Sequence, residues 1–329
     1  MKESPLPSAG GCEVDMENKG TITTFLTEDG FARLIFGETT GIVAWAAGRF
    51  TLSKTVTAAL GRGLTAAALM GSTLKDEAGS LTLRFRGSGP AGGLTCVSDA
   101  AGNVRGCADE PTAELPPNAA GKLDVGGVIG REGELYVVRD YGFGEPYVGH
   151  VQLVSGEIAE DITNYYAVSE QTPTVCALGV RVNRDGSLKS AGGFLLQLLP
   201  GAPDSLAEKL EGRIRALPSL SALIAQGKTA EDIAALVFGD VPYDAVGQCE
   251  ARYRCTCERE KYRRSIKSIG IRELTDMAES REGAEVVCRF CGEKYFFPPE
   301  ELDAMLAERK AELRANAARR ASTPPEENS

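Results

Sequence analysis

The first two thirds of the chain mix short segments of alternating apolar and polar residues with Ala-rich segments of helical period. Residues 81–86, L-T-L-R-F-R, alternate as a half-buried strand does. Similar strands, bounded by Gly, Asp or Asn, are predicted at 92–99, 133–140 and 150–155. An Ala-rich helix is predicted to open at Ser53. Residues 20–200 are therefore predicted to form an α+β domain with a mixed, largely antiparallel sheet.

A helical linker is predicted at 201–248, after a proline-containing boundary. Its first helix, which Pro218 ends, carries an apolar stripe at i, i+4, i+8 and i+11, formed by Leu206, Leu210, Ile214 and Leu217. Two shorter helices follow, from Ser219 to Gly227 and from Thr229, which begins the capping-box pattern T-A-E-D, to Gly239. Such short helices depend on packing for stability. We therefore expect Leu206, Leu210 and Ile214, the latch residues, to hold the linker in place.

Both ends of the chain are polar. Residues 1–19 predict a disordered extension, within which Met16 is an alternative start. Residues 301–329 predict a charged helix followed by the disordered segment S-T-P-P-E-E-N-S. The folded domains are expected between these two segments.

The composition is that of a globular protein, with 43% apolar and 25% charged residues in a chain of 329. The net charge of -10 repels polyanions, so no nucleic-acid partner is expected. No stretch resembles a signal peptide or a membrane span, which predicts a cytoplasmic protein without a membrane partner. The one histidine, His150, follows a Gly-rich strand pattern and is expected to be structural. The chain is not expected to be an enzyme.

Four of the nine cysteines have metal-ligand spacing. In the predicted domain at 249–300, Cys255 and Cys257 form a C-x-C pair, and Cys288 and Cys291 form a C-x-x-C pair 30 residues later. Disulfide frameworks are rare in the cytosol, so metal binding or thiol chemistry must account for such cysteines. Two close pairs on separate loops can converge into the tetrahedral shell of four thiolates that Zn²⁺ prefers. We predict one Zn²⁺ per chain in the reduced protein, in a closed and non-catalytic site.

Three other interpretations of the cysteines stay open: a permanent structural zinc site, a zinc-ribbon nucleic-acid-binding protein and a thiol-disulfide oxidoreductase. Residues 252–267 hold seven basic and two acidic side chains, a net of +5, which is the feature that suggests phosphate binding. A tetrathiolate zinc centre has a formal charge of -2, so the basic residues are expected to act on the thiolates instead. The G-x-G-x-x-G at 87–92 contains Pro90 and leads into a strand, so it is expected to be a turn and not a dinucleotide site.

Several segments resemble the redox-regulated heat-shock chaperones, the family of heat-shock protein thirty-three. These are C-T-C-E-R-E-K, S-I-G-I-R-E-L-T-D-M and V-V-C-R-F-C-G-E-K-Y-F-F, together with the upstream segments G-S-G-P-A-G-G, N-V-R-G, D-I-T-N-Y-Y-A-V-S-E-Q-T-P-T and G-G-F-L-L-Q-L-L-P. The resemblance spans roughly residues 22–310. It implies an ATP-independent holdase with a substrate-binding α+β domain, a helical linker and a zinc-thiolate switch.

The resemblance also implies what oxidation does. Disulfides would join Cys255 to Cys257 and Cys288 to Cys291, zinc would leave, and the linker would unfold. The chain would then bind unfolding client proteins and form a homodimer. Of the five cysteines outside these switch positions, Cys96, Cys107 and Cys176 are expected to be small buried hydrophobes, while Cys249 can divert the disulfide pattern.

Overall fold

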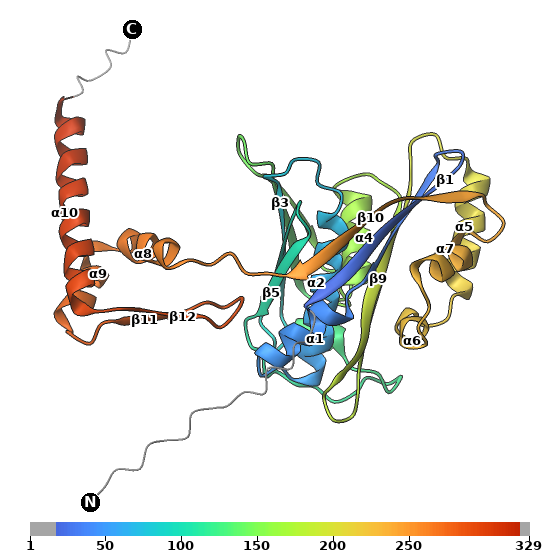
Figure 1. Cartoon of the computed structure of the whole chain (residues 1–329), viewed down its shortest axis with the longest axis horizontal. Helices are drawn as coiled ribbons and strands as arrows, with labels where there is room; N and C mark the ends of the chain where they lie inside the picture. Colours follow the sequence, from blue (N-terminus) through green and yellow to red (C-terminus); the bar gives the residue numbers. More distant parts are fainter. Residues whose placement is uncertain (1–17, 323–329) are drawn as a thin grey trace, which may run out of the picture. The chain divides into compact units, whose positions relative to one another are not determined.

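The computed structural model describes residues 18–322, with side chains up to residue 315. The predicted N-terminal extension, including Met16, and the C-terminal tail therefore lie almost wholly outside the described residues. The chain divides after Arg254 into two compact units (Figure 1). No helix in the described part is long and apolar enough to cross a membrane.

The first unit is built on a ten-stranded sheet with the order β7-β6-β3-β4-β5-β10-β1-β2-β9-β8. Its strands are β1 (Lys19–Thr27), β2 (Ala32–Glu38), β3 (Ser80–Gly87), β4 (Leu94–Asp99), β5 (Asn103–Ala108), β6 (Gly133–Asp140), β7 (Tyr147–Gln152), β8 (Thr174–Val182), β9 (Leu188–Leu198) and β10 (Tyr243–Tyr253). Neighbouring strands are antiparallel except β10 and β5. The predicted α+β class with a largely antiparallel sheet is confirmed. The G-x-G-x-x-G segment connects β3 to β4, as expected of a turn.

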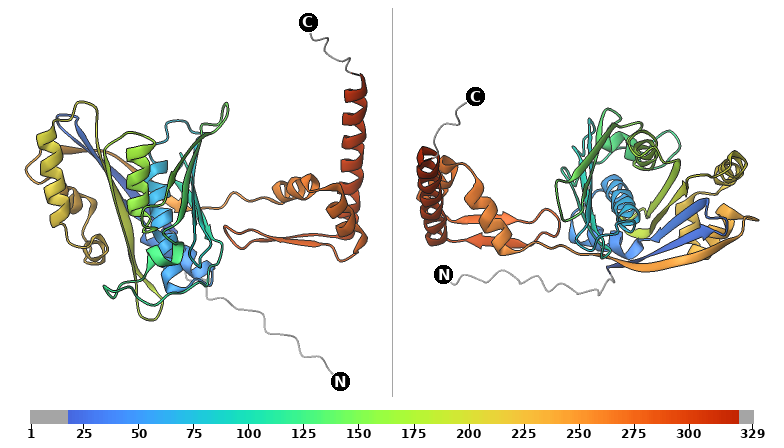
Figure 2. Two further views of the ribbon diagram at one scale, coloured as in Figure 1. Left: turned by 180° about the vertical axis from the view of Figure 1, so that it is seen from behind. Right: turned by 90° about the horizontal axis from the view of Figure 1, so that it is seen from above.

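Helix α2 (Lys54–Gly71) is the centre of the main core. It packs against strands from both halves of the sheet, which curves around it (Figure 2). Nearly every position of α2 is buried, and the small residues of its Ala-rich sequence let strands approach on several sides: a Cβ on Gly63 would lie 2.8 Å from Cys96 Sγ. As predicted, the helix opens at Ser53, whose side chain accepts a hydrogen bond from the Val56 N–H. Helices α1 (Thr40–Arg49), α3 (Val125–Ile129) and α4 (Ala159–Val168) surround it.

The linker helices α5 (Asp204–Ala216), α6 (Leu220–Ala225) and α7 (Ala230–Phe238) build a second core on the sheet. It joins apolar side chains of β1, β2 and β9 to those of the helices, among them Phe25, Leu34, Phe194, Leu206, Leu210, Ile233 and Phe238. The Thr229 side chain accepts a hydrogen bond from Asp232 N–H and completes the expected capping box. These helices are thus held by burial against the sheet, as their short lengths require.

Strand β10 departs from the sequence-based division of the chain. The predicted boundary between 248 and 249 falls inside this strand, and residues 243–248 are not helical. Most residues from 244 to 250 are exposed, and apolar and polar residues do not alternate there. The sequence therefore lacks the pattern that predicts a strand. Their conformation follows from pairing with β1, where Cys249 lies opposite Ile22. The second compact unit accordingly begins at Cys255 rather than at residue 249.

The second unit has a small core of its own. It contains α8 (Arg259–Ser268), α9 (Ile271–Glu279), the hairpin of β11 (Ala284–Val287) and β12 (Lys294–Phe297), and α10 (Pro299–Ser322). Seven buried residues form the core: Ile266, Leu274, Ala278, Ala284, Phe297, Leu302 and Met305. So few buried side chains give limited stability to a unit of this size.

Candidate metal centre

Four thiols converge in the second unit. The Sγ atoms of Cys255, Cys257, Cys288 and Cys291 all lie within 4.8 Å of one another. The Cys255 and Cys288 sulfurs are 3.7 Å apart, and those of Cys257 and Cys291 are 3.4 Å apart. The structure therefore brings together the four cysteines that the spacing singled out, and the cluster contains no carboxylate or histidine.

Two chain segments supply these thiols. Cys255 and Cys257 precede α8, whereas Cys288 and Cys291 occupy the turn between β11 and β12. This turn is closed by backbone hydrogen bonds from Cys288 N to Glu293 O (2.8 Å) and from Gly292 N to Cys288 O (2.7 Å). Gly292 has a φ of 73°, a conformation that glycine adopts without steric cost. The hairpin thus holds both thiols of the C-x-x-C pair toward one point.

The donor set fits Zn²⁺. Tetrahedral coordination with Zn–S bonds of about 2.3 Å places neighbouring sulfurs about 3.8 Å apart. The measured separations of 3.7 and 3.4 Å are close to this value. Four sulfur donors complete such a shell and leave no position for a substrate, so the arrangement is that of a structural rather than a catalytic metal site.

Two tyrosines lie against the thiols and were not predicted from the sequence. The Tyr295 hydroxyl is 3.2 Å from Cys257 Sγ, and the Tyr262 hydroxyl hydrogen-bonds to Cys288. Burial raises the pKa of Cys288, but the hydrogen bonds from Tyr262 and nearby groups outweigh it and lower the pKa to about 7. Burial raises the pKa of Cys255 to about 11. The hydrogen bonds to Cys288 thus favour the thiolate form of this cysteine.

Three of the seven basic residues near the cysteines, Arg259, Arg263 and Lys267, are paired with carboxylates of α10. Arg259 donates from both Nη atoms to the Glu301 carboxylate at 2.9 Å and lies 4.4 Å from the centre of the Phe297 ring. Arg263 and Lys267 bind Glu308, also on α10. These three side chains join α8 to α10. Because their charges are compensated by carboxylates, they also give little support to a phosphate-binding surface.

The remaining candidate residues lie apart from the metal centre. Cys96 and Cys176 are buried as expected, and burial raises the pKa of each thiol, which makes both inert. Cys107 is only half-buried, and Cys249 is exposed on β10. His150 is exposed on β7 and stacks on Tyr136, with ring centres 5.8 Å apart.

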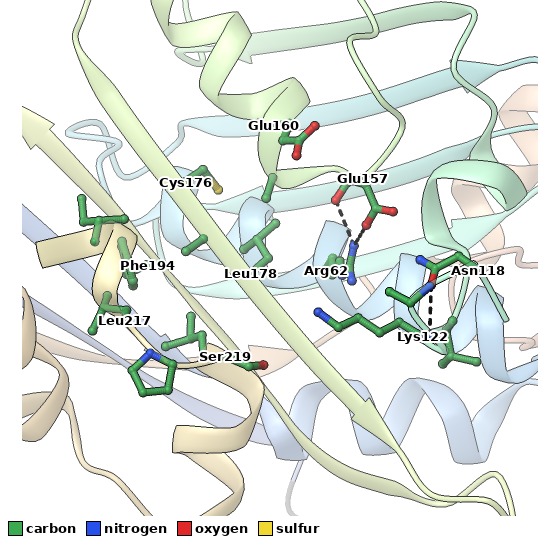
Figure 3. Close-up of a pocket in the computed structure, with 17 residues that line it drawn as sticks. Arg62, Asn118, Lys122, Glu157, Glu160, Cys176, Leu178, Phe194, Leu217 and Ser219 are labelled. Atoms are coloured by element: carbon green, nitrogen blue, oxygen red, sulfur yellow. Dashed lines mark hydrogen bonds and ion pairs between the residues drawn. The ribbon is translucent and has the colours of Figure 1, made fainter. Parts of the chain in front are cut away.

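The latch residues are brought together in the second core. Leu206 and Leu210 are buried, and Ile214 is half-buried against them. Helix α5 nevertheless covers the sheet incompletely. A cavity of about 590 Å³ lies where α5 meets α6, lined on one side by Leu178, Phe194 and Leu217 and on the other by polar side chains that include Arg62 and Glu157 (Figure 3).

The fold and the site together define a two-unit protein, in which a curved α+β sheet domain precedes a small module with a cluster of four thiols that could hold a metal ion. Comparison with known proteins identifies the group. The chain belongs to the Hsp33 family: the family model described as Hsp33 protein matches residues 20–298.

Relatives and a solved structure agree with this assignment. The chain is 46% identical over 275 residues to the 33 kDa chaperonin of Acetivibrio thermocellus, covering 84% of this chain and 93% of that protein. It is 42% identical over 288 residues to the 33 kDa chaperonin of Clostridium botulinum, covering 88% and 97%. The crystal structure of the 33 kDa chaperonin (Hsp33 homolog) of Thermotoga maritima matches with a TM-score of 0.80 and 38% identity, over 88% of this chain and 99% of that one.

Proposed function

We propose that this protein is a redox-regulated, ATP-independent holdase chaperone of the cytoplasm, inactive while its four thiols hold one Zn²⁺. The convergence of Cys255, Cys257, Cys288 and Cys291 within 4.8 Å on a small, separate core is the observation that carries this proposal. Membership of a family whose relatives are named chaperonins supports the holding activity.

We propose that the metal acts by stabilising the folded state of the second unit. A structural Zn²⁺ site contributes an apparent folding free energy on the order of 10–16 kcal/mol in small zinc domains. The seven-residue core of the second unit is too small to replace such a contribution. When hydrogen peroxide oxidises two thiols to one disulfide, it is itself reduced to two water molecules, and neither sulfur remains a thiolate ligand. Oxidation of both pairs is therefore expected to release the metal and unfold the second unit.

The disulfides are proposed within each close pair, Cys255 with Cys257 and Cys288 with Cys291. In the folded module, two sulfur–sulfur contacts of 3.7 and 3.4 Å join members of different pairs. As oxidation begins to loosen the module, contacts between the two chain segments are lost first, and loop-closure entropy favours the pairs that are nearest in the sequence. We expect the local pairing because each close pair stays within reach while the module unfolds.

Client binding is proposed to follow from release of the linker. The surface that α5 to α7 cover is the sheet, so their undocking would expose apolar side chains such as Phe25, Leu34 and Phe194, all buried in the docked state. Strand β10 joins α7 to Cys255 and is exposed along most of its length. We propose that loss of structure from Cys255 onward frees β10 and weakens linker docking. Oxidised chains are expected to form homodimers with a larger apolar surface.

The deciding experiment compares reduced and peroxide-treated protein in an aggregation assay with an unfolding client, while zinc release is followed in parallel. The proposal predicts that aggregation is suppressed only after oxidation, in proportion to the amount of added protein. Catalytic turnover of a disulfide substrate with zinc retained would instead favour a thiol-disulfide oxidoreductase. Zinc-dependent binding to nucleic acid without holding activity would favour the zinc-ribbon alternative.

A further inference from the structure

Two further cavities lie against helix α5 and share part of their lining. The smaller has a volume of about 210 Å³ and a mainly apolar lining that includes Val175, Leu196, Leu198 and Leu210. The larger has a volume of about 900 Å³. Both are lined by Leu198 of β9 and Ala207 of α5, so they form neighbouring compartments beneath one helix.

Two cationic side chains of the larger cavity, Arg33 and Lys75, have no carboxylate partner among the described residues. Arg33 is half-buried and donates from Nη2 to Gln197 Oε1 at 2.6 Å. Its Nε is buried without a hydrogen-bond partner, and within the described residues Arg33 forms no ion pair. Lys75 lines the same cavity and likewise has no ion pair in the described part of the chain. A guanidinium that is partly removed from water and unpaired favours binding of an anion.

The acidic groups that line this cavity compete only weakly with a ligand anion for Arg33 and Lys75. Glu170 is bound by Arg139 at 3.0 Å and accepts a hydrogen bond from the Tyr165 hydroxyl. Asp204 and Glu211 are on the exposed part of α5, where water screens their charges. Glu211 also pairs with Arg215 at 3.1 Å. The groups at Arg33 and Lys75 therefore remain the ones available to a ligand anion.

We propose that these compartments form a binding site for an amphipathic carboxylate of medium chain length. The carboxylate would bind Arg33 in the larger cavity, and the alkyl chain would occupy the apolar cavity beside Leu210. An apolar cavity of about 150 Å³ accommodates benzene, so 210 Å³ admits a chain of about six to eight carbons. Because Ala207 and Leu210 belong to α5, the bound molecule would also hold this helix against the sheet.

Equilibrium dialysis of octanoate against the reduced, zinc-loaded full chain tests the proposal. We expect saturable binding of one octanoate per chain, about fourfold tighter for each methylene added between hexanoate and octanoate. Arg33→Gln should weaken binding at least tenfold, because a charge-assisted hydrogen-bond pair is lost. Ala207→Leu should weaken it too, by filling the apolar compartment. Arg184→Gln, the same change in the exposed β8–β9 turn, is the matched control and should bind normally.

Three results would overturn the proposal: no saturable binding, binding that neither Arg33→Gln nor Ala207→Leu changes, or octanol bound as tightly as octanoate. Circular dichroism melting shows whether each variant is folded, and hydrogen exchange of the α5 amides supplies a second measurement. These amides should exchange more slowly with octanoate in the normal protein and in Arg184→Gln, but not in Arg33→Gln. If octanoate also slowed oxidative activation, the interpretation of that result would rest on the proposed function. The dialysis and hydrogen-exchange results do not depend on it.

Discussion

Replacing Leu210 by Asp tests whether linker docking controls client binding. Leu210 is only 2% exposed and packs within the second core. Truncation of a buried leucine costs about 2–5 kcal/mol, and burial of an unpaired carboxylate adds to that cost. The 210 Å³ cavity beside Leu210 gives the carboxylate room to turn toward water, so we expect about 3 kcal/mol. This value shifts the docking equilibrium by about a hundredfold.

The expected result is holding activity without oxidant. Reduced Leu210→Asp protein should suppress client aggregation, and its α5 amides should exchange faster than those of the unmodified chain. Zinc content should stay at one per chain, because Leu210 and the four thiols belong to different units. The variant would then show holding activity while it still carries its zinc.

The matched control is Leu236→Asp on α7. Leu236 is 40% exposed, so the same substitution there removes little buried surface and should leave the reduced protein inactive. The reasoning is refuted if Leu210→Asp is folded and zinc-loaded, shows faster exchange in α5, and still suppresses aggregation only after oxidation. Linker docking would then not gate the client-binding surface.

Three other perturbations test separate steps. Replacing both Cys288 and Cys291 by Ser should abolish zinc binding in metal analysis and unfold the second unit, whereas Cys249→Ser, a matched change at an exposed thiol, should leave one zinc per chain. Peptide mapping after mild peroxide and heat should find disulfides within each close pair; if Cys249 dominated them, the proposed pairing would be wrong. Ala207→Leu, which adds apolar volume beside the 210 Å³ cavity, should slow amide exchange in α5 and delay oxidative activation; unchanged rates would show that the cavity does not limit docking.

Local signals in the sequence predicted much of this protein. The helix opening at Ser53 and the capping box at Thr229 depend on side chains within three residues of the backbone groups that they cap, so no distant part of the chain is needed to specify them. The latch stripe is likewise a property of one helix, although the sheet surface that buries it is not. The four thiols were found because ligand spacing restricts which cysteines can reach one metal ion.

Other features depend on contacts between distant segments. Strand β10 has no hydrophobic alternation and forms because β1 offers it a pairing partner 227 residues away in the sequence, as between Cys249 and Ile22. Tyr262 and Tyr295 look like ordinary aromatic residues of a helix and a strand, and only folding places their hydroxyl groups on the thiols. The basic residues were expected to serve the thiolates because α10 could not be placed beside them from sequence alone.

The sequence by itself thus determined the helix starts, the apolar stripe of the linker and the identity of the four thiols, because each follows from residues that are close in the chain or from a ligand pattern. Only the tertiary structure decided the strand order, the conformation of β10, and the place of Arg33 in the larger cavity beside α5. Burial, cross-strand pairing and hydrogen bonding to groups more than a hundred residues away set these features, and a local pattern carries no record of such partners.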